Sequence, residues 1–373
     1  MNRKLKTYKL LLTVKGSVFI GSGKEISKKE YIYLPGKEVQ IMNIDKIYSL
    51  CEKKRLEKNY VDFLMNGYKE PLGQWLEKKK VCPSEIEACI RYRLSNQDAQ
   101  LERGKSLQIM EFVKDSYGQP YVPGSSVKGM LRTILLTADI LKHPQKYSEY
   151  RENITREVFG RREGKVNRRA VLSRTIRDIE NKNFHTLSRT EKMADAVNDY
   201  MSGMIVSDST PLEISDLVLC QKIEKHADGR ETKLNLLREC LKPGTVIECD
   251  LTIDTSICKI TVEDMQHAIE LFEEMYEDNF LSKYKTMDKL TADSVYLGGG
   301  AGFVSKTIIY ALFQKTEGIK MIQNIFEKTD VPKVHKHGQD LKYGVSPHIL
   351  KCTHYRGKTV QMGLCTCKIQ EKS

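Results

Sequence analysis

Two segments of this sequence place glycines beside lysine and arginine side chains in a spacing suited to binding phosphate. The first, YVPGSSVKGMLRTILL at 121–136, runs from an apolar stretch through a glycine and two serines into a helical pattern. A helix N-terminus has unpaired N–H groups and a partial positive charge, and cations four residues apart share a face. The groups that could contact phosphate are Gly124, Ser125, Ser126, Lys128 and Arg132. The segment therefore predicts either a phosphate site or an ordinary capped helix with two solvated cations.

The second segment, SVYLGGGAGFVSKTIIYALF at 294–313, contains more glycines than a turn requires. A glycine cluster loses much conformational entropy on folding, so it indicates that something approaches the backbone closely. Its candidate binding residues are Gly298, Gly299, Gly300, Gly302 and Lys306, the last at the start of an expected helix. A third glycine turn, after the first expected strand, has the candidates Gly21, Ser22, Gly23 and Lys24. Three such turns favour a long polyanion over a single nucleotide.

An arginine-rich segment at 161–177 carries seven cations. It could be a solvated insertion, but this density of positive charge favours contact with RNA or with a neighbouring subunit. Its candidate RNA-binding residues are Arg161, Arg162, Arg168 and Arg169.

The familiar nucleotide-binding motifs do not fit this sequence. A P-loop requires serine or threonine after its lysine, and Glu25 stands at that position. The dinucleotide fingerprint requires a third glycine where the sequence has Phe303. No stretch fits the aromatic RNP1 strand of an RNA recognition motif. Tyr31 and Tyr33 share an expected strand face, where they could stack on bases or pack in the core.

The composition favours an anionic partner. The 373 residues include 61 Lys and Arg against 49 Asp and Glu, a formal net charge of +12. This balance is common in nucleic-acid-binding proteins, although a basic surface without a partner would also produce it. No window reaches the roughly 20 apolar residues of a membrane span, and the first apolar run is too short for a signal peptide. We therefore expect a cytoplasmic protein without membrane contact, whose ten cysteines are reduced thiols.

The elements that must position these residues follow no regular strand–helix alternation. Strand patterns lie at 8–23, 30–43, 106–124 (a hairpin), 203–212, 216–226 and 242–254. Mostly helical patterns lie at 43–104, 126–141 and 261–284, the last beginning with a capping-box-like Thr261 and Asp264. The tail from 326 reads as loop-rich with a short final strand. Paired strands with helices between them are typical of α+β, ferredoxin-like units.

Five blocks of this sequence resemble the signature blocks of the RAMP superfamily, whose members form the RNA-binding backbone of CRISPR effector complexes. They are FIGSG at 19–23, YVPGSSVKGMLR at 121–132, VFG at 158–160, IVSDS at 205–209 and LGGGAGFVSKT at 297–307. The second and the last block are the most specific, and together the five span most of the chain. With the ending HYRGKTVQMGLCTCKI, the pattern most resembles the type III-A (Csm) subunit at the 3′ end of the CRISPR RNA, and the motifs alone also fit a type III-B relative.

This resemblance implies a ferredoxin-like (RRM-like) RAMP core at 1–250, with helical insertions at about 43–104 and 142–200. A second, related C-terminal lobe with the late glycine-rich loop would follow at 251–373. The resemblance implies a subunit that caps the 3′ end of the guide RNA and contributes to antiviral defence and CRISPR RNA maturation. Its implied partners are CRISPR RNA, target RNA, and the adjacent backbone and small subunits of the Csm complex. The glycine loops and their cations would contact the RNA backbone, with base identity read by pairing.

The resemblance does not extend to catalysis. Backbone subunits of Csm complexes cleave target RNA with an aspartate soon after the first strand, where this sequence has Glu25 and Glu30 and no aspartate before Asp45. Processing members of the superfamily use a histidine near the first strand, and the first histidine here is His143. Asp208 lies in a strand block, where we expect a structural role. We therefore expect no catalytic residue and no cofactor; the alternative is a RAMP-superfamily endoribonuclease.

Cysteines and histidines gather near the C-terminus of the sequence. The candidate metal ligands there are Cys352, His354, Cys365 and Cys367, with His335, His337 and His348 as further possibilities. One residue between paired ligands is a poor spacing for structural zinc, which favours two to four. We therefore favour buried or idle thiols and loop histidines over a metal site.

Overall fold

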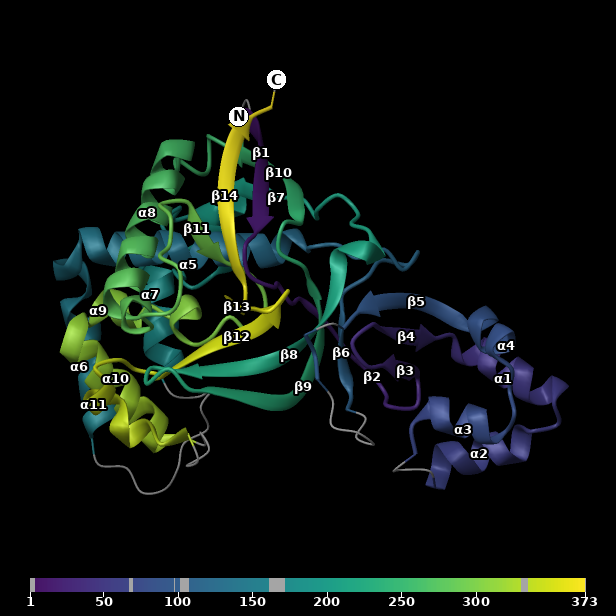
Figure 1. Ribbon diagram of the computed structural model, residues 1–373. Helices are drawn as coiled ribbons and strands as arrows, with labels where there is room; N and C mark the ends of the chain where they lie inside the picture. The colour runs from purple at the N-terminus through teal and green to yellow at the C-terminus, as the bar shows by residue number, and fades with distance from the viewer. Residues whose placement is uncertain are drawn as a thin grey trace.

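A computed structural model describes residues 4–66, 70–96, 98–100, 107–160, 172–329 and 335–372. The strands form two sheets, and the N- and C-termini lie together at the top of the view in Figure 1. The helices of residues 44–88 lie at the far right of that view, away from the termini.

The smaller sheet joins the two ends of the chain. β1 (Leu5–Val14) lies between β10 (Val246–Asp254) and β14 (Leu364–Glu371), and β7 (Met204–Val206) and β11 (Ser294–Tyr296) form the edges. All four pairings are antiparallel. Alternate residues of β1 are buried, which is the period-two pattern of a strand with one face on the core. The first and last strands therefore share one hydrogen-bonded ladder.

Two long helices accompany this sheet. α5 (Gly124–Lys142) packs on α8 (Val262–Asn279), and they contact the edge strands β7 and β11 respectively. The predicted capping box of α8 is confirmed: the Asp264 N–H donates to Thr261 Oγ1 at 3.1 Å, and the Thr261 N–H donates to the Asp264 carboxylate at 2.9 Å. Most of the predicted apolar stripe of α8 is buried: Met265, Ala268, Ile269, Phe272 and Met275. Val262, the first residue of the predicted stripe, is only partly buried.

In the described part of the chain, the larger sheet has nine strands. They are β2 (Gly21–Ile26), β3 (Tyr31–Leu34), β4 (Glu38–Met42), β5 (Ile90–Ser95), β6 (Ile109–Phe112), β8 (Leu217–His226), β9 (Glu231–Leu241), β12 (Ile349–Tyr355) and β13 (Lys358–Gln361). Their order is β2-β6-β9-β8-β5-β4-β3, and β12 branches from β8 and carries β13. The β5/β8 and β6/β9 pairs are parallel.

The helical segment after β4 has a hydrophobic core of its own. It comprises α1 (Ile44–Lys53), α2 (Glu57–Asn66), α3 (Leu72–Lys78) and α4 (Pro83–Ala88). Trp75 lies at its centre, with ring centroids 5.0 Å from Phe63 and 5.5 Å from Tyr60. Ten buried side chains, among them Met42 of β4, form this cluster, which is separate from the main core.

Among the described residues, five further α-helices lie between and after these elements. They are α6 (Ser148–Phe159), α7 (Ser173–Phe184), α9 (Ile309–Leu312), α10 (Lys315–Lys328) and α11 (Asp340–Tyr343). Among the described residues, none of the helices has the length and apolar character needed to cross a bilayer.

The predicted α+β composition is confirmed, while several elements differ from expectation. The 43–104 segment also contains β5, and β9 was not predicted because its first three residues are charged or polar and exposed. The tail is not loop-rich throughout: it supplies β12, β13 and β14. The division at residue 250 stays a prediction; that residue lies within β10, and strands from both sides of it share each sheet.

Two glycines of α5 provide a matched test of close helix packing. A Cβ on Gly124 would lie 2.2 Å from the Val206 carbonyl oxygen, whereas a Cβ on Gly129 would meet no atom within 4 Å. We expect Gly124→Ala to lower the free energy of unfolding by about 1–3 kcal/mol because the helix must move away from β7. Gly129→Ala should raise it by about 0.5–1 kcal/mol because alanine favours the helix. Urea unfolding measures both, and equal effects would contradict the close-packing role of Gly124.

Candidate nucleic-acid interface

A cavity of about 350 Å³ lies beside the late glycine-rich loop and is also lined by β8, β9, β12 and the segment at 335–337. We call it the basic pocket. Its cationic and glycine lining residues are Lys222, Arg238, Lys306, Lys351, Gly300 and Gly302. No acidic side chain is among its described lining residues, so four cations face a space with no carboxylate in its wall.

Arg238 on β9 is the central cation of the basic pocket. Its guanidinium lies over the Phe19 ring, 5.0 Å from the centroid, and burial lowers its pKa. Its Nε and Nη1 are buried and have no hydrogen-bond partner among the described residues. Arginine stays protonated even so, and a buried cation without a partner is unfavourable. The side chain is therefore suited to an anion that enters the pocket.

Gly300 makes room for this guanidinium. Its φ of +81° is favourable only for glycine, and a Cβ there would lie 2.3 Å from Arg238 Nη1. The sequence predicted that some group approaches the glycine cluster closely. In the structure, that group at Gly300 is the Arg238 side chain of the same protein. The backbone of the loop and the Arg238 side chain then share one wall of the pocket.

A single carboxylate holds two lysines at the pocket. Glu224 on β8 pairs with Lys351 at 2.6 Å and with Lys222 at 3.3 Å. Burial alone would raise the pKa of Glu224, but the two ammonium groups hold it below its usual value. Glu224 thus neutralises one of the two charges, and the pocket retains a positive surplus.

Lys306 lies in the 3₁₀ turn Val304–Lys306 and not at the start of a long helix, which corrects the sequence expectation. Its ammonium group has no ion-pair or hydrogen-bond partner among the described residues, and burial lowers its pKa. It also lines a second cavity of about 250 Å³ together with Arg132 and Phe303. Lys306 therefore lies where the two cavities adjoin.

The residues just before the first predicted glycine turn contact the late loop. The Gly299 N–H donates to the Phe19 carbonyl at 2.6 Å, which ties the two segments together. Gly21, Gly23 and Lys24 follow as an exposed part of β2. The Ser22 hydroxyl donates to the Glu111 carboxylate at 3.0 Å. The structure thus brings two of the three predicted glycine turns close together.

Three of the candidate residues in the 121–136 segment have polar partners within the protein. The Gly124 N–H donates to Asp208 Oδ1 at 2.8 Å, and Lys128 Nζ donates to the Met204 carbonyl at 2.7 Å. Arg132 pairs with Asp199 at 2.7 Å and lies 3.8 Å from the centroid of the Phe184 ring. The structural role expected for Asp208 is confirmed, because its carboxylate contacts the N-terminus of α5 where a phosphate was predicted.

A profile of the RAMP superfamily matches residues 11–305 of the chain. The chain belongs to the RAMP superfamily. The RAMP resemblance drawn from the motifs is thereby confirmed.

This RAMP chain is similar to proteins named Csm5. It is 31% identical to Csm5 of Mycobacterium tuberculosis (strain ATCC 25618 / H37Rv), over 99% of both chains. It is 28% identical to Csm5 of Streptococcus thermophilus, over 86% of this chain and 84% of that protein. A chain in the cryo-EM structure of a Csm–crRNA–target RNA ternary complex of a type III-A CRISPR–Cas system has the same fold, with a TM-score of 0.61 and 18% identity over 97% of this chain and 100% of that chain.

Four candidate residues of this RAMP chain lie outside the described residues: Arg161, Arg162, Arg168 and Arg169. Three cations of the basic pocket were not among the candidates. Lys222, Arg238 and Lys351 were not predicted, because each stands in a strand that mixes apolar and polar residues. The alternation along β9 could have placed Arg238 on one face, but only the fold brings that face to the late loop.

The C-terminal metal candidates of this RAMP chain lie in different sheets. Cys352 is on β12, and Cys365 and Cys367 are on β14. His354 pairs with Glu231 at 2.9 Å. Burial raises the pKa of Cys352 and of Cys367 to about 12, so both sulfurs stay protonated thiols. Within the described parts of the chain, these four side chains do not form one metal-ligand group.

The contacts of Arg132 give its substitution a clear expected effect on stability. Arg132→Ala removes an ion pair and a ring contact and leaves Asp199 without its arginine. We expect the free energy of unfolding in urea to fall by about 1–3 kcal/mol. The control Lys24→Ala, at an exposed position, should change it by less than about 0.5 kcal/mol. An Arg132→Ala variant that is fully stable yet binds RNA weakly would instead support the phosphate role predicted from the sequence.

Proposed function

We propose that this chain is a non-catalytic RNA-binding and assembly subunit of a type III-A CRISPR (Csm) complex. It binds CRISPR RNA, lies beside target RNA and the backbone and small subunits, and caps the 3′ end of the guide in the cytoplasm. Membership of the RAMP superfamily and similarity to Csm5 proteins support this proposal. We also propose the finer architecture: a ferredoxin-like core with helical insertions and a related lobe after about residue 250.

The observation that carries RNA binding is the unpartnered guanidinium of Arg238 beneath Gly300. A guanidinium donates two parallel N–H bonds to phosphate oxygens, and such charge-assisted bonds are among the stronger ones in proteins. Lys222, Lys306 and Lys351 extend the positive charge on the same pocket. A phosphate of the RNA backbone supplies the missing acceptor and balances the surplus charge.

The candidate residues differ in how well their surroundings support this proposal. The late loop from Gly298 to Gly302 and Lys306 adjoins the basic pocket, and the first residues of β2, Gly21–Lys24, follow the Phe19 contact. The four candidate arginines between 161 and 169 remain proposed RNA contacts. For Gly124, Lys128 and Arg132, the internal partners favour a role in holding α5 in place.

Substitution of Arg238 tests the phosphate contact. Arg238→Gln keeps much of the side-chain volume but removes the charge, so we expect single-stranded RNA to bind about tenfold more weakly. The slope of log K against log salt should fall in magnitude by about 0.7, the value for one phosphate contact. Stability should stay equal or rise, because a buried unpaired cation is lost. Filter binding at several salt concentrations and urea unfolding measure the two effects.

Two glycine substitutions provide the control for this experiment. Gly300→Ala and Gly302→Ala both place alanine at positive φ, but only the first forces an atom to within 2.3 Å of Arg238. Gly300→Ala should therefore weaken RNA binding more than Gly302→Ala at similar stability. Equal binding by Arg238→Gln and the unaltered chain would remove the pocket from the RNA site. RNA that is cut in these reactions, with or without divalent metal, would favour the alternative of a RAMP-superfamily endoribonuclease.

The proposed cap role rests on the size of the two insertions. A repeating subunit forms an open filament because each face finds its complement on the next copy. The α1–α4 segment has its own core, and the second insertion contributes α6 and α7, so neither is a simple connection. We propose that one or both cover the face on which another copy would dock.

This proposal predicts the number of copies per complex. Native mass spectrometry of complexes assembled on guides of different lengths should find one copy of this chain each time. A copy number that rises with guide length would make the chain a repeating backbone subunit and rule out the cap role.

A further inference from the structure

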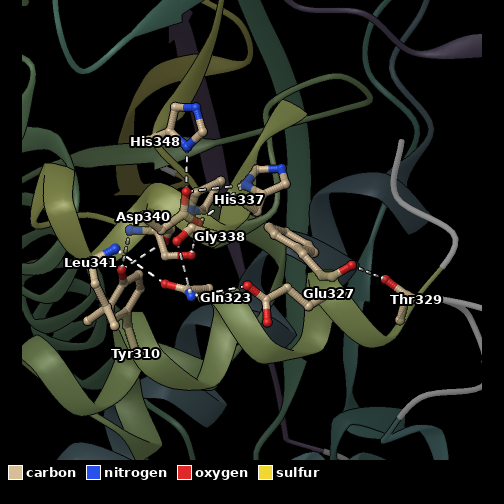
Figure 2. A network of polar contacts seen from close by, with 12 residues as sticks. Tyr310, Gln323, Glu327, Thr329, His337, Gly338, Asp340, Leu341 and His348 are labelled. Atoms are coloured by element: carbon tan, nitrogen blue, oxygen red, sulfur yellow. Dashed lines mark hydrogen bonds and ion pairs between the residues drawn. The ribbon is translucent and has the colours of Figure 1, made fainter. Parts of the chain in front are cut away.

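Two histidines point at one buried aspartate beside the basic pocket. Figure 2 shows the rings of His337 and His348 directed at the Asp340 carboxylate. His337 Nδ1 lies 3.2 and 3.4 Å from the two oxygens, and His348 Nδ1 makes a shorter contact with Oδ1. One ligand atom from each of the three residues lies within 4.8 Å of the others.

The charge of Asp340 needs a counter-charge. Its side chain is 0% exposed, and no lysine or arginine pairs with it among the described residues. Its polar contacts are the two imidazoles and the Ser346 hydroxyl. A buried carboxylate is unfavourable unless a cation balances it. The balancing charge is either a protonated imidazole or a bound metal ion.

The geometry points to a metal ion: we propose that His337, Asp340 and His348 bind one Zn²⁺. Two histidines and one carboxylate are a common ligand set for zinc. Two ligand atoms at tetrahedral positions about 2.0–2.1 Å from zinc are about 3.3 Å apart, which matches the distances from His337 to Asp340. The His348 ring moves back slightly when the ion enters. Water or His335, whose ring lies 5.9 Å from that of His337, takes the fourth position.

The surrounding residues hold the three ligands in place, as residues around metal ligands do. Gln323 on α10 accepts from the Leu341 N–H at 3.3 Å and donates to the Gly338 carbonyl at 3.5 Å, which positions the backbone around Asp340 (Figure 2). Tyr310 on α9 donates to the Ser346 carbonyl at 2.7 Å and accepts from its N–H at 3.1 Å. These contacts come from elements that do not themselves supply a ligand.

The position of the site gives the ion a structural role. Asp340 begins α11, and His348 immediately precedes β12. An ion between them joins the segment at 335–343 to the larger sheet. His337 also lines the basic pocket, so the ion fixes part of the pocket wall. Metal binding can be measured without RNA, so this inference stands or fails separately from the proposed function.

The test is the zinc content of the full-length protein. The chain is treated with a chelator, incubated with excess Zn²⁺, desalted and analysed by mass spectrometry of the metal. We expect about one zinc per chain and a higher melting temperature with zinc than without it. His337→Gln and Asp340→Asn should each lower the affinity at least about tenfold. His337 is the least buried ligand, so its variant is the one best able to fold.

Two variants are matched controls. His267→Gln removes an exposed histidine whose described polar contact is with Glu270, and Cys82→Ser removes the exposed thiol. Both should bind zinc as the unaltered chain does. Zinc that is retained by His337→Gln but lost from Cys82→Ser would overturn the site. A chain that binds no zinc would show that the zinc proposal is wrong. If the melting temperature of that chain also falls as the pH rises from about 5.5 to about 7.5, an imidazolium balances the Asp340 carboxylate.

Discussion

The pairing of β1 with both β10 and β14 is the constraint on which the candidate interface depends. After β1, the chain continues along the strands of the C-terminal part. The Gly16 N–H donates to the Leu364 carbonyl, and the Gly363 N–H donates to the Ser17 carbonyl. The Gly299 N–H then donates to the Phe19 carbonyl. These backbone bonds place the late glycine-rich loop over β9, where Arg238 lies beneath it. Without the pairing of the chain ends, the loop would have no fixed position relative to that guanidinium.

Local patterns predicted those elements whose stability is local. The capping box and apolar stripe of α8, the alternation of β1 and the hairpin of β3 and β4 all follow from short-range periodicity and turn residues. β9 begins with exposed polar residues and pairs with β8 and β6, so its pattern carries little local signal. β12 follows glycines and histidines that suggested a loop, and its partner β8 is distant in the sequence. The short final strand was predicted and is β14, but its pairing with β1 was not visible in the sequence.

The candidate site could likewise be predicted only where its signal is local in the sequence. The late glycine loop and Lys306 were found because glycine clusters are visible in a sequence. Arg238 was not, because its significance comes from Gly300 and Phe19, which are distant in the sequence. The N-terminus of α5 shows the opposite case. Its pattern predicted either a phosphate site or an ordinary capped helix, and the Asp208 carboxylate of the same chain accepts from its Gly124 N–H. A local sequence pattern cannot distinguish an internal carboxylate from an external phosphate, because both satisfy the same N–H groups.

Three buried or half-buried charges around the basic pocket differ in the partners that they have. Lys351 lies directly opposite Glu224 in the β12–β8 ladder, so a cross-strand pair holds it in place. Asp340 has only imidazoles and a hydroxyl as described polar partners. Arg238 stacks on Phe19 but has no carboxylate partner for its Nε and Nη1.

Each unsatisfied buried polar group costs roughly 1–3 kcal/mol, so the fold retains Arg238 at the expense of stability. Such a loss is typical of binding sites, where a free group is kept for a ligand. The rigid walls of the pocket also favour binding. The sheet ladder, the Phe19 contact and the histidine cluster already fix the pocket, so it loses little entropy when an anion binds.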